Sequence, residues 1–168
     1  MLKLIEIHAD IDARVQSIRA SQIDWPCSKG CDRCCQRLAE VPRLTEAEWI
    51  LLREGLAALS VERLAEIRRE IGALTQSPRP LTCPLLERAS GVCPVYHQRP
   101  VACRTYGFYV QRDLGLYCSE IEVHVTDGEL SDVVWGNQDA VERELAALGK
   151  MRSLVEWFGD WDRTEQGQ

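Results

Sequence analysis

Hydrophobic residues recur every three or four positions near the start of the chain, and charged residues fill most of the positions between them. This is the pattern of an amphipathic α-helix with one buried face. The apolar positions of this segment are Leu4, Ile7, Ile11, Val15 and Ile18. We predict a helix that ends before the Trp25-Pro26 step, because proline disfavours helix in the residue that precedes it.

Two further helices are predicted between residues 45 and 76. Thr45 and Glu48 have the spacing of a capping box, in which the threonine hydroxyl accepts from the amide of residue 48 and the glutamate carboxylate reaches back. Ser60 is a suitable cap for the next helix. The apolar positions of these two helices are Trp49, Leu52, Leu56, Leu59, Leu64, Ile67, Ile71 and Leu74. Residues 76–80 contain two prolines and end the second helix.

The segment from residue 81 to about 134 has a different character, with short β-prone stretches interrupted by proline and glycine. These stretches are 92–96, 106–111 and 121–125. Because each is short and flanked by turn residues, we predict loops with one or two small hairpins rather than an extended sheet. A last helix is predicted from Gln138, with an apolar pattern that allows it to continue past Gly149 to Phe158.

The composition is that of a folded domain, since 45% of the 168 residues are hydrophobic and 27% are charged. No apolar run approaches the roughly 20 residues that a membrane span requires. The first ten residues include acidic side chains, which argues against a signal peptide. We therefore expect a cytoplasmic protein without a membrane partner.

The formal charge of −6 is concentrated near the end of the chain, where residues 119–168 carry 12 acidic and 4 basic side chains. Nucleic-acid binding depends largely on the neutralisation of phosphates by basic side chains. This distribution argues against a nucleic-acid partner, and we expect the acidic segment to form a solvated face.

Eight cysteines are the most unusual feature of the composition. They are Cys27, Cys31, Cys34 and Cys35 in a first group, and Cys83, Cys93, Cys103 and Cys118 in a second. Cytoplasmic thiols stay reduced, so we expect these side chains to bind metal rather than to form disulfides. The two groups are 47 residues apart, and two predicted helices lie between them. The ligands must therefore be brought together by folding.

The first group allows three interpretations. Its positions match one face of a helix, so the thiols could pack in a core. The Cys31-x2-Cys34 pair also has the spacing of a redox motif, although the alternating strands and helices of a thioredoxin-like protein are absent. Four cysteines within nine residues exceed what packing requires, so metal ligation is favoured. Neighbouring side chains diverge, and one of Cys34 and Cys35 is therefore expected to serve a second metal or only to pack.

Proline follows both Cys83 and Cys93 in the second group. It holds the preceding cysteine extended and removes an amide that would need a partner. Basic side chains outnumber acidic ones by two in residues 27–43 and again in 83–104, which favours the thiolate form. Both groups thus have the charge environment of thiolate ligands, although the second is more widely spaced.

The spacing also bears on the identity of the metal. Zinc sites commonly use two Cys-x2–4-Cys pairs, whereas the second group here has gaps of nine residues or more. Eight sulfurs also exceed the needs of one zinc ion. Iron–sulfur clusters accept irregular spacing and all-cysteine ligation. We therefore favour a 4Fe–4S cluster as the cofactor, with zinc as the alternative.

These motifs resemble those of the YkgJ-like cysteine-cluster family, described as a zinc- or iron-chelating domain. The resemblance rests on residues 27–35 (CSKGCDRCC), 83–86 (CPLL) and 91–104 (GVCPVYHQRPVACR), and it covers about residues 25–120. It implies a metal or iron–sulfur centre held by the cysteines. It does not imply one reaction, because the domain occurs alone and also within larger enzymes such as a flagellin lysine methylase. Family members usually have an aromatic-proline step soon after the last motif, where this chain has Tyr106-Gly107.

Three histidines complete the set of candidate ligands. His97 lies between Cys93 and Cys103, so it is a candidate ligand or a donor to a sulfur. His8 is expected at the edge of the core. His124, within the β-prone stretch 121–125, is expected at an exposed strand position.

Together these features predict a mainly α fold, with one small helical domain over residues 1–168. Its irregular cysteine-rich module, at about residues 25–120, is expected to be organised around a metal centre, with helices before, within and after it. The predicted function is to hold a 4Fe–4S cluster for electron transfer, oxidoreductase chemistry or a maturation role. The alternatives are a zinc-binding structural or metal-handling module without catalysis, and an enzyme that acts through an open iron site or a free cysteine. Metal ions are the expected partners, with a redox or client protein as a second candidate.

Overall fold

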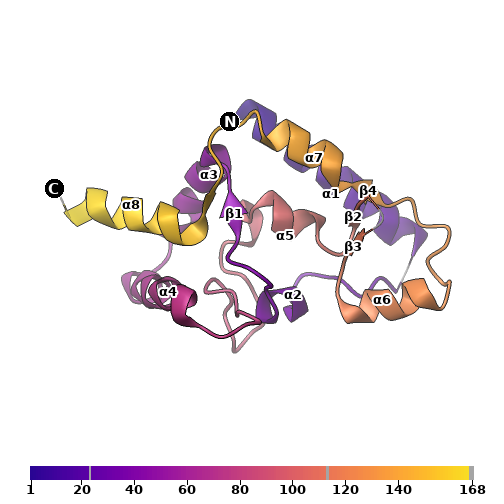
Figure 1. Cartoon of the computed structure of the whole chain (residues 1–168), viewed down its shortest axis with the longest axis horizontal. Coiled ribbons are helices and arrows are strands. Elements are labelled where there is room, and N and C mark those ends of the chain that lie inside the picture. The colour runs from indigo at the N-terminus through magenta and orange to yellow at the C-terminus, as the bar shows by residue number, and fades with distance from the viewer. Residues whose placement is uncertain (23, 113, 167–168) are drawn as a thin grey trace. The chain divides into compact units, whose positions relative to one another are not determined.

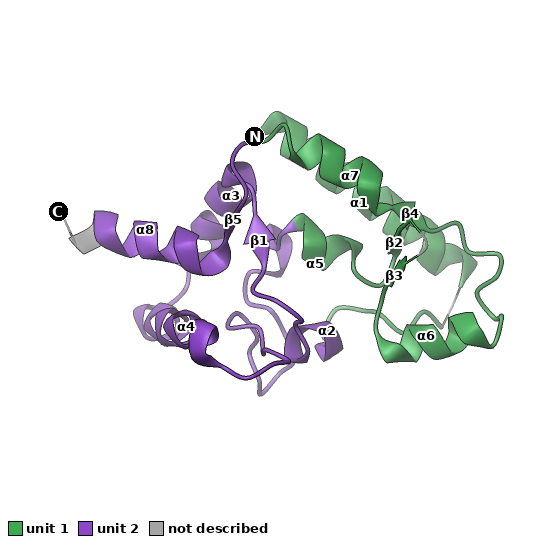
Figure 2. Cartoon of the chain, viewed as in Figure 1, with its two compact units in different colours: residues 1–29, 101–148 green, residues 30–100, 149–168 purple. Residues whose placement is uncertain are grey.

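The computed structural model describes residues 1–22, 24–112 and 114–166. Within these ranges it contains eight α-helices and five strands of two or three residues, so the predicted mainly α class is confirmed. The chain divides into two compact units, one of residues 1–29 and 101–148 and one of residues 30–100 and 149–168 (Figure 2). The cysteine-rich stretch contributes to both units. The single-domain organisation stays a prediction.

The first unit is built on the long helix α1 (Leu2–Ser21), which is the helix predicted from the first apolar pattern (Figure 1). α1 contacts α5 (Val101–Thr105) and α7 (Gln138–Leu145). The buried residues of α1 are Leu4, Ile7, His8, Ile11, Val15 and Ile18. The apolar positions found in the sequence are therefore the packed face of the helix, and His8 lies beside them as expected.

A small three-stranded sheet completes this unit with α6 (Ser119–Thr126). Its central strand β2 (Tyr109–Gln111) pairs antiparallel with β3 (Leu114–Leu116) and parallel with β4 (Gly136–Asn137). The β2–β3 hairpin confirms the small hairpin that the sequence predicted.

Helix α6 corrects the prediction of a β-prone stretch at residues 121–125. Its first turn carries the acidic residues Glu120 and Glu122, which interact favourably with the amino end of a helix. Ile121 is buried, whereas Val123 is exposed. His124 therefore lies on a helix rather than on a strand, and it is half-buried.

The second unit packs α3 (Glu46–Ala57), α4 (Val61–Ala73) and α8 (Leu154–Gln166) around an apolar core. Both predicted caps are present: Thr45 and Glu48 form the capping box of α3, and the Ser60 hydroxyl accepts from the Arg63 amide. The 3-10 turn η1 (Leu74–Gln76) follows α4, and β1 (Arg43–Leu44) pairs antiparallel with β5 (Arg152–Ser153). The aromatic part of the core consists of Trp49, Trp157, Phe158 and Trp161.

The helix predicted from Gln138 is present as α7, but it does not continue past Gly149 to Phe158, as the apolar pattern allowed. α7 ends at Leu145, and α8 begins at Leu154 after strand β5. Gly149, between them, has a φ of +108°, a backbone conformation that side chains with a Cβ rarely adopt. The glycine thus marks a turn, while the apolar residues beyond it start a separate helix.

Candidate metal centre

The eight cysteines are divided between the two units. Cys31, Cys34, Cys35, Cys83 and Cys93 belong to the second unit, and Cys27, Cys103 and Cys118 belong to the first. All eight lie in the described part of the chain, and none of them forms a disulfide there.

A single helical turn positions the adjacent thiols Cys34 and Cys35. This turn, α2 (Arg33–Gln36), begins after Asp32, whose carboxylate accepts from Gln36 Nε2 at 2.6 Å. The sulfurs of Cys34 and Cys35 are 4.0 Å apart. Although neighbouring side chains in a helix generally diverge, these two thiols are within contact distance.

Backbone hydrogen bonds join the first cysteine group to the second. The amide of Cys83 donates to the carbonyl of Cys35 at 2.6 Å, and Leu38 and Leu81 exchange two hydrogen bonds of 2.8 and 2.9 Å. Residues 35–38 thus lie antiparallel to residues 81–83. This contact brings Cys35 and Cys83 side by side, although 47 residues separate them in the sequence.

The chain between Cys83 and Cys93 folds back on itself. Glu87 and Val92 form a short antiparallel bridge, and Gly91 has a φ of +69° within this turn. A Cβ at Gly91 would lie 3.0 Å from the carbonyl oxygen of Gly30, so glycine permits a close approach to the first cysteine segment. Cys83 and Cys93 themselves pack, half-buried, against the core of the unit.

We call Cys34, Cys35, Cys83 and Cys93 the thiol quartet. The hydrogen bond with Cys35, together with burial, raises the pKa of Cys34 well above its usual range. The contact with Cys34 lowers the pKa of Cys35, but hydrogen bonding to Cys83, burial and the charges of Cys83 and Cys93 outweigh it and raise the pKa to about 12. Without a metal the quartet is therefore rich in protonated thiols, and metal binding must release protons.

Two arginines lie near Cys93. Burial raises the pKa of Cys93, whereas a backbone hydrogen bond and the charges of Arg99 and Arg63 oppose that increase. The Arg99 guanidinium lies 3.7 Å from the centre of the Tyr96 ring, and Arg63 donates to the Leu86 carbonyl at 3.1 Å. The structure thus brings a cation from α4 to the thiols. No pattern in the sequence indicates this contact, because Arg63 lies 30 residues before Cys93.

The first unit holds three thiols in separate elements, whereas the remaining thiol, Cys31, belongs to the second unit and is half-buried. Cys27 contacts Gly107, where a Cβ would lie 3.2 Å from the Cys27 sulfur, and Gly107 has a φ of +88°. Cys103 lies in α5 and is exposed, and Cys118 is the N-cap residue of α6. The Tyr106-Gly107 step, which departs from the aromatic-proline step of the family, therefore supplies the glycine that packs against Cys27.

Across the described residues, no three His, Cys, Asp or Glu side chains already have the arrangement of a metal site. His97, in the 3-10 turn η2 (Tyr96–Gln98), is exposed, with its ring edge-on to Tyr96. The thiol quartet nevertheless suits a soft metal, because it offers four sulfurs from two chain segments. Four is also the number of thiolates that one structural zinc ion or one 4Fe–4S cluster takes.

The fold and this site define a mainly helical protein with a thiol-rich candidate metal centre. Residues 26–121 match the model of the CxxCxxCC family, described as a "putative zinc- or iron-chelating domain". The match spans more than half of the chain, and the protein belongs to this family, as the resemblance implied. Family membership supports metal binding and includes both zinc and iron. The family title has two residues between its first two cysteines, whereas this chain has three between Cys27 and Cys31.

Comparison with curated proteins and with solved structures found no match. Within the described ranges, none of the helices combines the length and apolar character needed to cross a membrane.

Proposed function

We propose that this protein holds a 4Fe–4S cluster through cysteine thiolates, with the thiol quartet as the core of the ligand set. The observation that carries the proposal is the hydrogen-bonded contact between the Cys35 and Cys83 segments, which gathers thiols from both cysteine groups. A 4Fe–4S cluster takes four cysteine ligands, and the quartet supplies that number.

The bound cluster would supply one-electron transfer, which suits an electron-transfer or maturation role with a redox or client protein as partner. Arg63 and Arg99 would offset part of the negative charge of the thiolates beside Cys93. We also propose the other four cysteines, Cys27, Cys31, Cys103 and Cys118, as metal ligands.

Zinc is the second candidate, because the distance between the Cys34 and Cys35 sulfurs favours it. Two thiolates bound to one tetrahedral zinc ion lie about 3.8 Å apart, given Zn–S bonds of about 2.3 Å. The Cys34 and Cys35 sulfurs are 4.0 Å apart. In this case the metal would contribute folding energy rather than redox chemistry.

Metal and sulfide analysis of the anaerobically purified full chain separates the two candidates. The iron–sulfur proposal predicts brown protein with at least about four iron atoms and four acid-labile sulfides per chain. Colourless protein with stoichiometric zinc and no sulfide would overturn it in favour of zinc.

Matched serine variants test the ligand set. The double variant Cys83→Ser/Cys93→Ser should lose its metal while circular dichroism reports whether its helices remain. The triple variant Cys27→Ser/Cys103→Ser/Cys118→Ser should keep the centre formed by the quartet. If the double variant retains the full metal content, the quartet is not the core of the site.

A further inference from the structure

Two thiols of the quartet come from chain segments that already lie against each other. The amide of Cys83 donates to the carbonyl of Cys35 at 2.6 Å, and the Cys35 thiol also interacts with the Cys83 thiol. The bridge between Leu38 and Leu81 holds the same two segments antiparallel a few residues further on. Cys35 and Cys83 are therefore neighbours through contacts that involve no metal.

The geometry of disulfide bonds distinguishes this pair from the adjacent cysteines. A disulfide usually joins Cα atoms about 4.4–6.8 Å apart, and residues paired by hydrogen bonds between antiparallel strands have Cα atoms about 5.5 Å apart. Consecutive residues have Cα atoms only about 3.8 Å apart. A disulfide between Cys34 and Cys35 is therefore disfavoured, although their sulfurs are 4.0 Å apart. Cys35 and Cys83 have the kind of backbone contact that a disulfide bridges.

Cys93 is less suitably placed to pair with Cys83. The bridge between Glu87 and Val92 sets the register of the turn that leads from Cys83 to Cys93. Continued by one residue, this register puts Cys93 opposite Leu86 rather than opposite Cys83. The structure therefore favours Cys35 over Cys93 as the partner of Cys83.

We propose that the thiol quartet is a redox-sensitive site, in which a peroxide oxidises Cys35 and Cys83 to a disulfide when no metal is bound. Hydrogen peroxide transfers one oxygen atom to one of the two sulfurs, which gives a sulfenic acid and a water molecule. The other sulfur then attacks the sulfenic sulfur, and the S–S bond forms. The sulfenic oxygen leaves as a second water molecule with the proton of the attacking thiol. One peroxide and two thiols thus give one disulfide and two water molecules.

This disulfide excludes a metal from the quartet. The metal ligand is the thiolate, so oxidation removes two of the four ligands and leaves only Cys34 and Cys93. One structural zinc ion or one 4Fe–4S cluster takes four. The effect on the metal rests on the proposed function, whereas the formation of the disulfide does not. Oxidation therefore prevents metal loading until a reductant restores both thiols.

Peptide mapping of the metal-free full chain tests the pairing. The protein is treated with a chelator and hydrogen peroxide, the remaining thiols are alkylated, and the chain is digested with trypsin, which does not cut before proline. The relevant peptides are 34–37 with Cys34 and Cys35, 70–88 with Cys83, and 89–104 with Cys93 and Cys103. Mass spectrometry should find 34–37 joined to 70–88 as the main disulfide species, and dithiothreitol should separate the two peptides.

Matched serine variants identify the cysteine that reacts in peptide 34–37. Cys34→Ser should keep the link to peptide 70–88, whereas Cys35→Ser should lose it. Protein unfolded in urea is the control for the fold: it should instead link 70–88 to 89–104, because short loops close more readily than long ones. The pairing is overturned if Cys35→Ser keeps the link, if another disulfide is the main product of the native protein, or if native and unfolded protein give the same products.

Zinc uptake tests the effect on the metal, in the triple variant Cys27→Ser/Cys103→Ser/Cys118→Ser that keeps the quartet. Reduced and peroxide-treated samples are incubated with zinc chloride, desalted and analysed for bound metal. The oxidised sample should bind about one zinc ion less per chain than the reduced sample, and dithiothreitol should restore uptake. If the reduced sample binds no zinc, the proposed metal site fails while the mapped disulfide stands. If the oxidised sample contains the disulfide and binds as much zinc as the reduced one, the redox-sensitive site is overturned.

Discussion

Replacement of Thr45 by alanine tests how the second unit holds a buried carboxylate. Thr45 is 0% exposed and Glu48 is 3% exposed. The Thr45 hydroxyl donates to Glu48 Oε2 at 2.8 Å, the Thr45 amide donates to the same oxygen at 2.8 Å, and the Glu48 amide donates to the hydroxyl at 3.4 Å. Thr45→Ala removes both hydroxyl interactions and leaves the bond from the Thr45 amide in place.

The size of the effect follows from these contacts. Loss of a threonine N-cap costs about 1 kcal/mol, and loss of a hydrogen bond to a charged group costs about 1.5–3 kcal/mol. We therefore expect Thr45→Ala to lower the free energy of unfolding by about 2.5–4 kcal/mol. Thr45→Ser keeps the hydroxyl and loses one buried methyl group, so it should cost only about 1 kcal/mol.

Ser60→Ala is the matched control. Ser60 is an exposed N-cap that accepts from the Arg63 amide at 3.2 Å, and its hydroxyl also interacts with the exposed Glu62 carboxylate. Ser60→Ala should lower the free energy of unfolding by about 0.5–1 kcal/mol. Urea unfolding at constant metal content, followed by far-ultraviolet circular dichroism, gives the three values. If Thr45→Ala costs no more than Ser60→Ala, the hydroxyl does not stabilise the buried Glu48 carboxylate and this reasoning is refuted.

Three other substitutions are expected to change the stability that thermal denaturation measures. Gly107→Ala should lower stability by about 1–3 kcal/mol, because its φ of +88° is strained for alanine and its Cβ would lie 3.2 Å from the Cys27 sulfur. Gly72→Ala, in helix α4 with nothing within 4 Å of the new Cβ, should instead raise stability by about 0.5–1 kcal/mol; equal effects would contradict the structure. Trp157→Phe should cost about 1–3 kcal/mol, because the buried Leu44 carbonyl loses the indole donor at 3.1 Å; no loss would show that this bond is dispensable.

Local patterns in the sequence predicted four of the helices in the described residues, α1, α3, α4 and α7. The apolar spacing before Trp25 and the caps at Thr45 and Ser60 each depend on residues within a few positions of one another, and all three helices formed as expected. Local information was ambiguous at residues 121–125, where β-branched residues favour a strand but the structure has α6. The spacing of apolar residues also did not reveal that the helix ends before Gly149, because apolar residues on both sides of this glycine are buried.

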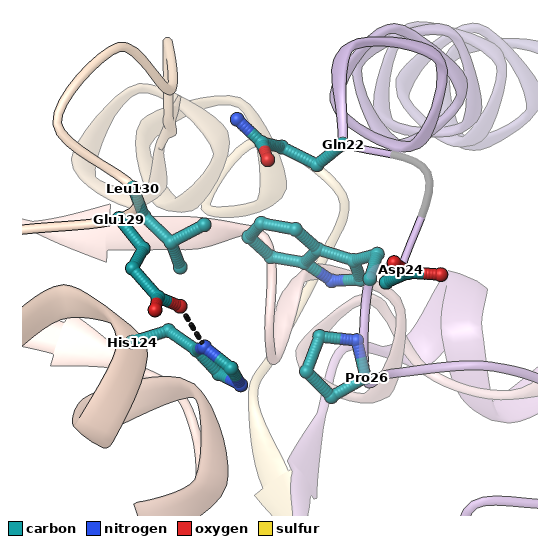
Figure 3. A pocket seen from close by; sticks show the side chains of 7 residues that line it. Gln22, Asp24, Pro26, His124, Glu129 and Leu130 are labelled. Carbon is teal, nitrogen blue, oxygen red and sulfur yellow. Dashed lines mark hydrogen bonds and ion pairs between the residues drawn. The ribbon is translucent and has the colours of Figure 1, made fainter.

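The sequence identified the cysteines but not their grouping. Cys35 and Cys83 are joined through the bridge between Leu38 and Leu81, a contact between segments separated by α3 and α4 that no local motif encodes. The same limit applies to a pocket of ≈ 290 Å³ in the first unit (Figure 3), which is lined by Trp25 with its neighbours and by residues about 100 positions later in the chain. Residue types with distinctive chemistry are visible in a sequence, whereas their neighbours depend on packing between distant segments.

The contact between the Cys35 and Cys83 segments weakens the argument against zinc that was based on the spacing of the cysteines along the chain. The nine-residue gaps of the second group disfavour zinc only if ligands must come from pairs close in sequence. Folding supplies such proximity here, because backbone hydrogen bonds place Cys83 beside Cys35 whatever their separation along the chain. The nine-residue gaps are therefore not an argument against zinc. One zinc ion and one 4Fe–4S cluster each use only four of the eight thiols. Neither the spacing nor the number of the sulfurs therefore separates zinc from iron, and the metal and sulfide analysis of the purified protein decides between them.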